Sequence, residues 1–176
     1  GLSGTLDSME MIANQLEMKF VGVDCYCTAV EQGCMIETAK KMYEANIPID
    51  EIIKKLQSIA DSCETVLLCD DLDHMKRGGR LTPMAAALGG LLKIKPILHI
   101  GKSGRVDVLD KVRTMTRAQD RVIKHLKELN VDSDYTFIVA HVDALEAAKE
   151  YAQKIESQIE GAKVKVINLV SAVGIH

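Results

Sequence analysis

The sequence predicts an α/β protein in which helices cover one face of a mixed β-sheet. Amphipathic helical patterns alternate with short apolar runs along the chain, which is typical of strand–helix–strand units. Two extended runs, at 95–100 and 106–113, are separated by the turn sequence GKSGR and predict an antiparallel hairpin. A sheet that contains both kinds of connection is mixed.

The first part of the chain is predicted to be mainly helical. Apolar residues at helical spacing predict helices at 5–18, 30–46 and 48–63, and FVGVDCYC predicts a strand at 20–27. Ser3 or Thr5 is placed to cap the first helix, and Pro48 stands near the first turn of the third.

The second part alternates strands with helices. The expected strands are 64–70, 95–100, 106–113, 135–142 and 162–170. The expected helices are 71–77, 116–130 and 144–159.

Composition excludes several classes of function. A chain of 176 residues with 47% hydrophobic residues can bury a core, and no apolar run is long enough to cross a bilayer. The net charge of -3 argues against a nucleic-acid partner. The five cysteines lack the paired spacing of a zinc site, so we expect no metal and predict buried, reduced thiols in a cytoplasmic protein.

The stretch KRGGRLTPMAAALGGLLKIKPIL, residues 76–98, raises the question of a phosphate loop. It lacks the Lys-Ser/Thr ending of a P-loop and the three spaced glycines of a dinucleotide loop. Gly78 and Gly79 are better explained as the end of a helix, while Arg80 suits an anionic group or an acidic partner. Gly89 and Gly90 either allow close helix packing or leave room for a ligand.

No residue is predicted to be catalytic from a motif. Ser3 has no nucleophile-elbow sequence around it, and the histidines share no metal-ligand spacing. His141 and His176 stand at strand ends, where α/β proteins often bind ligands, so an enzyme that uses either one is kept as an alternative.

Four segments together resemble the DegV family of bacterial fatty-acid-binding proteins. GLSGT at the start is similar to the end of the family's Ser-Gly-Leu-Ser-Gly-Thr motif, and VGIH resembles the start of its His-Thr-Gly-Pro-Gly loop. DLDHMKRGGRLTPMAAALGGLLKIKPIL resembles the central signature, and GRVDVLDKVRT resembles the Lys-x-Arg-Thr segment that follows it. The resemblance covers the whole chain in order.

The resemblance implies a specific domain organisation. Residues 1–62 would be the tail of a three-layer, parallel-sheet domain, and residues 63–176 would be a two-layer, mixed-sheet domain with a lipid tunnel. Segments that the family carries before Gly1 and after His176 are absent, so the resemblance implies a chain truncated at both ends.

The resemblance also assigns roles to residues. The fatty acid carboxylate would be bound by Ser3, Gly4 and His176, and Arg80 and Arg113 would engage the kinase partner and the phosphorylated head group. The acyl tunnel would be lined by Leu88, Gly89, Leu91, Leu92, Ile94, Ile97 and Leu98.

The implied function is that of a carrier without catalytic activity of its own. It would bind a long-chain fatty acid, present the carboxylate to the catalytic subunit of fatty acid kinase, and hold the acyl phosphate, with no cofactor. The alternatives are a subunit of a small-molecule kinase or hydrolase, and a structural fragment that binds no ligand.

Overall fold

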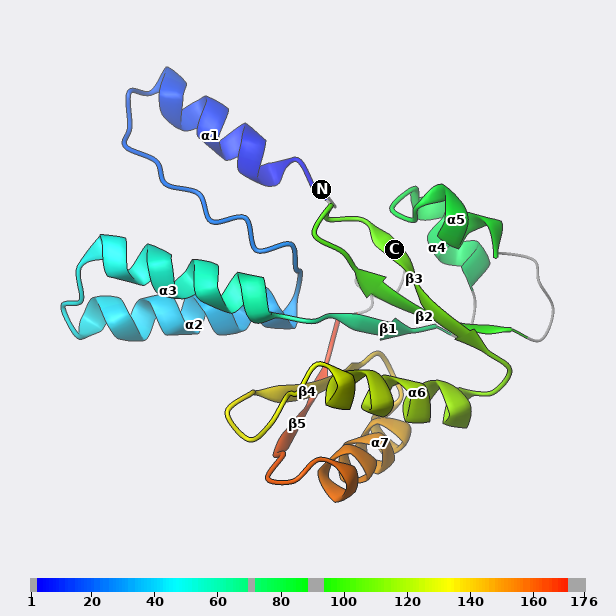
Figure 1. Cartoon of the computed structure of the whole chain (residues 1–176). Coiled ribbons are helices and arrows are strands. Elements are labelled where there is room, and N and C mark those ends of the chain that lie inside the picture. The colour runs from blue at the N-terminus through cyan, green and yellow to red at the C-terminus, as the bar shows by residue number, and fades with distance from the viewer. Residues whose placement is uncertain (1–2, 70–71, 89–93, 171–176) are drawn as a thin grey trace. The chain divides into compact units, whose positions relative to one another are not determined.

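The computed structural model describes residues 3–69, 72–88 and 94–170, and all structural statements below concern these residues (Figure 1). Three helices come first, strands and helices follow, and the two alternate from β3 onward. They are α1 (Thr5–Gln15), α2 (Val30–Glu44), α3 (Ile49–Ser62), β1 (Val66–Leu68), α4 (Leu72–Gly78), α5 (Pro83–Ala87), β2 (Lys95–Ile100), β3 (Val106–Val112), α6 (Met115–Glu128), β4 (Phe137–His141), α7 (Leu145–Gln158) and β5 (Val164–Asn168). The predicted α/β class is confirmed.

The chain forms two compact units. The first contains the described residues up to Thr65 and the segment His99–Val106, and the second contains Val66–Leu98 and the described residues from Asp107 onward. The segment around the β2–β3 turn therefore belongs to the first unit, which the sequence did not indicate. The predicted division into family domains after residue 62 stays a prediction.

A helical hairpin, α2 and α3, forms the main part of the first unit. The short connection between the helices contains Asn46, whose φ of 57° is the left-handed conformation that commonly ends a helix. The Ile47 N–H donates to the Met42 carbonyl at 3.0 Å and closes this turn. Because the connection is short, α2 and α3 run antiparallel and pack against each other. Met35 is buried in α2, and Ile52 and Ala60 are buried in α3.

The predicted strand at 20–27 is wrong. Neither a strand nor a backbone–backbone hydrogen bond occurs in residues 19–28, as far as the described chain goes. An apolar alternating segment becomes a strand only when a neighbouring strand accepts and donates its backbone hydrogen bonds, and this segment has no such neighbour.

The second unit contains a three-stranded sheet in the order β1-β2-β3. The turn between β2 and β3 is closed by the Gly101 N–H, which donates to the Arg105 carbonyl at 3.1 Å, and Gly104 adopts a positive φ of 67°. Neighbouring strands with so short a connection are antiparallel, which confirms the predicted hairpin. Ile97 packs against Ala118 and Val122 of α6.

A parallel pair, β4 and β5, completes the second unit, with α7 as its crossover helix. Its core consists of Ile123, Phe137, Ile155, Ile159 and Ala162. Since Ile123 belongs to α6, that helix contributes to this cluster and to the cluster around Ile97. The hairpin and the parallel pair are both present, in two separate sheets.

Candidate functional site

An apolar pocket between α5 and β3 is the best candidate for a ligand site, and it lies within the second unit. Its volume is about 250 Å³. We call it the α5–β3 pocket, and its walls are formed by Met84, Leu88, Val108, Leu109, Asp110 and Lys111. Four of these side chains are apolar, so the pocket is suited to a hydrocarbon group.

The position of α5 beside β3 is fixed by a hydroxyl group. Thr82 caps α5, because its Oγ1 accepts a hydrogen bond from the Ala85 N–H at 3.2 Å, and Pro83 occupies the first turn. The same hydroxyl donates to Oδ1 of Asp107 at 2.8 Å. Thr82 therefore connects the helix to the strand that forms the opposite wall.

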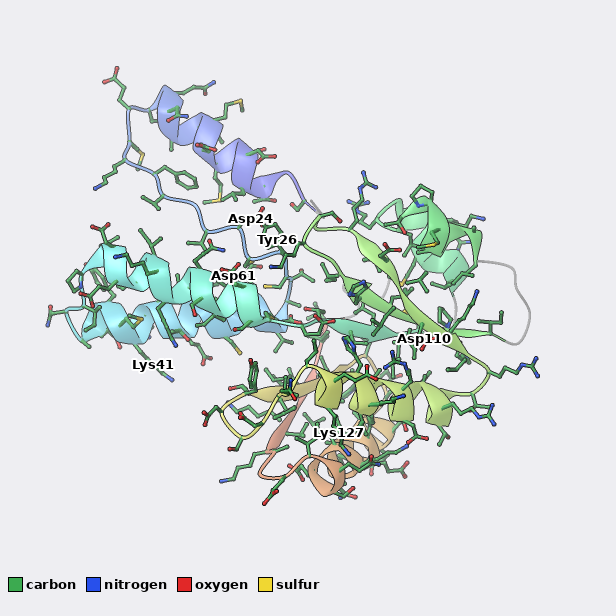
Figure 2. The ribbon with its side chains drawn as sticks, in the orientation of Figure 1. Asp24, Tyr26, Lys41, Asp61, Asp110 and Lys127 are labelled. Atoms are coloured by element: carbon green, nitrogen blue, oxygen red, sulfur yellow. The ribbon has the colours of Figure 1, made fainter. Side chains whose placement is uncertain are left out.

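The polar end of the pocket is formed by Asp110 and Lys111. The N–H of Lys111 donates to Asp110 at 2.7 Å and the Arg121 guanidinium donates to it at 2.7 Å, and both lower the pKa of the Asp110 carboxyl (Figure 2 labels Asp110). The carboxylate is therefore ionised and already paired with Arg121, while the Lys111 side chain is exposed to solvent.

The predicted tunnel residues are only partly brought together at this pocket. Leu88 lines it, Ile94 is half-buried, and Gly89, Leu91 and Leu92 lie outside the described residues. Ile97 and Leu98 are both fully buried, but neighbouring residues of a strand point to opposite faces, and Ile97 packs against α6.

The two arginines that the resemblance assigns to the kinase partner are both exposed. Arg80 follows Gly79, whose φ of 70° confirms the predicted helix-ending turn, and its guanidinium donates to the Gly78 carbonyl. Arg113 directly follows β3 and forms no ion pair with any other described residue.

The three predicted carboxylate-binding residues are not placed as a site. The Ser3 hydroxyl lies 2.6 Å from the Thr5 hydroxyl and accepts from the Thr5 N–H at 3.2 Å. Gly4, not Ser3 or Thr5, is the N-cap residue of α1, which has no side-chain cap. His176 lies outside the described residues. The carboxylate site therefore stays a prediction.

His141 is poorly suited to acid–base chemistry in this structure. Its Nδ1 accepts a hydrogen bond from the Ala144 N–H at 3.2 Å. Its Nε2 is buried and has no hydrogen-bond partner. A general acid or base must reach a substrate proton, and this buried nitrogen is not accessible to one. No group of metal ligands is found in the part of the chain that the structure describes.

A larger hollow, of about 520 Å³, lies along α1. Asp7, Glu10, Met11, Asn14 and Gln15 line it, and all five belong to that single helix. A ligand site needs a second wall to exclude water, so this hollow is the exposed side of a helix and not a candidate site.

Sequence reasoning missed the opposite wall of the pocket. It placed the lipid-facing residues between positions 88 and 98, whereas Met84 and Val108 lie outside that range. The Thr82-Pro83 pair was a usable signal for the start of α5, since a capping hydroxyl followed by proline is typical of a helix start. The pairing of Thr82 with Asp107 had no local signal.

Comparisons with known proteins identify the relatives of this chain. The sequence model described as "Uncharacterised protein, DegV family" matches residues 1–176. A DegV domain-containing protein of Streptococcus pneumoniae is 33% identical over 177 residues, covering 100% of this chain and 63% of the relative. The chain thus spans less than two thirds of that relative's length.

Solved structures share the fold. A fatty acid binding DegV family protein from Streptococcus agalactiae superposes with a TM-score of 0.88 at 25% identity, covering 99% of this chain and 62% of that one. The Streptococcus pneumoniae Fatty Acid Kinase B3 protein, solved with linoleic acid, has a TM-score of 0.79 at 15% identity. The superposition covers 95% of this chain and 61% of the B3 protein. No helix in the described ranges has the length and apolarity that a bilayer span requires.

Proposed function

Since the chain belongs to the DegV family, we propose that it binds a long-chain fatty acid and presents the carboxylate to a separate, ATP-dependent kinase. The observation that carries this proposal is the α5–β3 pocket, an apolar space of about 250 Å³ between α5 and β3. The fatty-acid-binding relative with the same fold supports it.

The acyl chain supplies most of the binding free energy. Burying a methylene group contributes about 0.8 kcal/mol, whereas a solvent-exposed ion pair at the head group contributes roughly 0 to 1 kcal/mol. Several buried methylenes therefore outweigh the carboxylate contact. Leu88 and Val108 hold part of the chain, and the predicted tunnel from Leu88 to Leu98 holds the rest.

The head group carries the chemistry of transfer in this proposal. Ser3, Gly4 and His176 bind the carboxylate, and Arg80 and Arg113 engage the kinase or the acyl phosphate. The exposure of both guanidinium groups supports this assignment, because an exposed arginine can form paired hydrogen bonds with phosphate oxygens or with carboxylates of a partner.

The partner supplies the catalysis. Phosphoryl transfer needs sites for a nucleotide and Mg²⁺, and the glycine loop at 76–82 lacks the residues of a P-loop. The buried Nε2 of His141 argues against an enzyme that depends on His141, while the alternative that uses His176 lies outside the described residues. The proposal includes a cytoplasmic location, since all five cysteines are free thiols and a reducing compartment preserves them.

Fatty acid titration of the delipidated chain tests this function. We expect Leu88→Asp to weaken binding at least about tenfold, because it places a charge in the apolar wall. Leu88→Met, which conserves side-chain volume, is the matched control and should bind within about threefold of the unchanged chain. Equal affinity of Leu88→Asp and the unchanged chain would remove the α5–β3 pocket from the proposal.

A further inference from the structure

The eight methionines of the chain differ in their exposure to solvent, and all of them lie within the described residues. Met84 is 63% exposed, and Met9, Met11 and Met18 are between 53% and 61% exposed. The other four are buried or half-buried. Because a thioether is oxidised only where the oxidant can reach its sulfur, the four exposed methionines are the ones open to oxidation.

Met84 differs from the other three exposed methionines because it lines the α5–β3 pocket. It belongs to α5, and Leu88 and Val108 lie in the same pocket wall (Figure 1 labels α5 and β3). The bond from the Thr82 hydroxyl to Asp107, at 2.8 Å, holds α5 at the strand that forms the opposite wall. A hydrocarbon chain bound in this pocket therefore lies beside Met84.

The charges around the exposed methionines differ as well. The one acidic residue of the α5–β3 pocket is paired with Arg121 at 2.7 Å, which leaves the exposed Lys111 ammonium to attract an anion. Met11 also lies in a hollow, but that hollow is lined by Asp7 and Glu10, which repel a carboxylate. An anionic amphiphile is therefore directed to the pocket of α5 and not to the hollow along α1.

We propose that Met84 is an oxidation site whose oxidant is a fatty acid hydroperoxide bound in the α5–β3 pocket, an inference that rests on the proposed function. The Met84 sulfur attacks the terminal oxygen of the hydroperoxide and the O–O bond breaks. The proton of the transferred hydroxyl passes to the leaving alkoxide, which becomes the alcohol of a hydroxy fatty acid. The sulfur is oxidised by two electrons to the sulfoxide, and the peroxide is reduced by two.

The pocket selects this oxidant because binding replaces a random encounter with a held one. A hydroperoxide that carries a hydrocarbon chain is kept beside the Met84 sulfur, so its effective concentration there exceeds its concentration in solution. Hydrogen peroxide has no hydrocarbon group and gains nothing from the apolar wall. The two oxidants should therefore modify different sets of methionines.

The reaction also changes the pocket. A sulfoxide places a polar oxygen where the thioether was apolar, and hydrocarbon bound against it prevents water from hydrating that oxygen. The oxidised chain should therefore bind fatty acid more weakly. Met84 oxidation in this way makes fatty acid binding sensitive to peroxidised lipid.

Peptide mapping by mass spectrometry tests the choice of oxidant. The full, delipidated chain is treated with linoleic acid hydroperoxide or with hydrogen peroxide, quenched with free methionine and digested. We expect the ratio of Met84 oxidation to the mean oxidation of Met9, Met11 and Met18 to be at least about fivefold higher with the lipid hydroperoxide. Excess linoleic acid should lower this ratio by competition. Equal ratios for the two oxidants would overturn the proposal.

Fatty acid titration before and after treatment tests the consequence. Met84→Leu has an apolar side chain without sulfur, and its affinity is compared with its own value before treatment. We expect treatment to weaken binding at least about threefold in the unchanged chain and in Met11→Leu, and to leave Met84→Leu at its starting affinity. An equal loss in Met84→Leu would contradict this inference alone, since binding before treatment would still support the proposed function. Absence of binding in every untreated protein would overturn both.

Discussion

The substitution Thr82→Ala removes the hydroxyl that connects α5 to β3. Thr82 forms two hydrogen bonds, one from the Ala85 N–H at 3.2 Å and one to Asp107 at 2.8 Å. Loss of a capping bond costs about 1 kcal/mol, and loss of a half-buried bond to a carboxylate costs about another 1 kcal/mol. We therefore expect the free energy of unfolding of the second unit to fall by about 2 kcal/mol.

Thermal and urea unfolding followed by circular dichroism measure this loss. For a chain of this size, about 2 kcal/mol corresponds to a fall in Tm of roughly 4 to 8 °C. Because α5 forms one wall of the α5–β3 pocket, fatty acid affinity should fall in the same variant. Thr82→Ser keeps the hydroxyl and should stay within about 1 kcal/mol of the unchanged chain.

Two results would refute this reasoning. If Thr82→Ser loses as much stability as Thr82→Ala, the methyl group and not the hydroxyl is responsible. If Thr82→Ala unfolds like the unchanged chain, the two hydrogen bonds do not determine the position of α5.

Four further substitutions test separate parts of the structure. Tyr151→Phe removes a buried hydroxyl without a partner, so calorimetry should give a stability equal to the unchanged chain or up to about 1 kcal/mol higher. Burial raises the pKa of this phenol, so above pH 10 the phenol ionises more readily in the unfolded chain than in the fold and the fold loses stability; Tyr151→Phe should therefore lose less stability in alkali. The pKa of the Asp110 carboxyl is lower in the fold than its ordinary value of 3.8, so the ionised carboxylate stabilises the fold above pH 3.8. This stabilisation is lost as the pH falls through the lowered pKa. Asp110→Asn should therefore remove up to about 1 kcal/mol of this stabilisation, measured by urea unfolding at several pH values. The value is small because the ion pair with Arg121 is partly exposed to solvent. Arg80→Ala and Arg113→Ala should still bind fatty acid but lose acyl phosphate formation by the kinase, and loss of lipid binding would contradict their assigned role.

Much of the helical structure could be predicted from local patterns. The expected helix at 30–46 corresponds to α2, and the helix at 48–63 corresponds to α3, each within two residues at either end. Proline at helix starts and glycine at helix ends act through backbone geometry that depends on neighbouring residues only, as at Gly79. Such features are visible in the sequence because their causes are local.

Features that depend on distant partners could not be predicted in the same way. The run at 20–27 has the composition of a strand, but a strand requires a neighbour that the pattern does not reveal. The bond of Thr82 to Asp107 joins residues 25 positions apart. The Thr65 hydroxyl donates to Glu31 of α2, 34 positions earlier, and no local pattern in the sequence indicates this bond.

Native mass spectrometry before and after organic extraction tests the central claim, fatty acid binding, most directly. The account predicts that the chain carries one long-chain fatty acid, that extraction removes it, and that incubation with saturated or unsaturated fatty acids restores it. A chain that stays at its unliganded mass, both as purified and after incubation with these acids, would contradict the account.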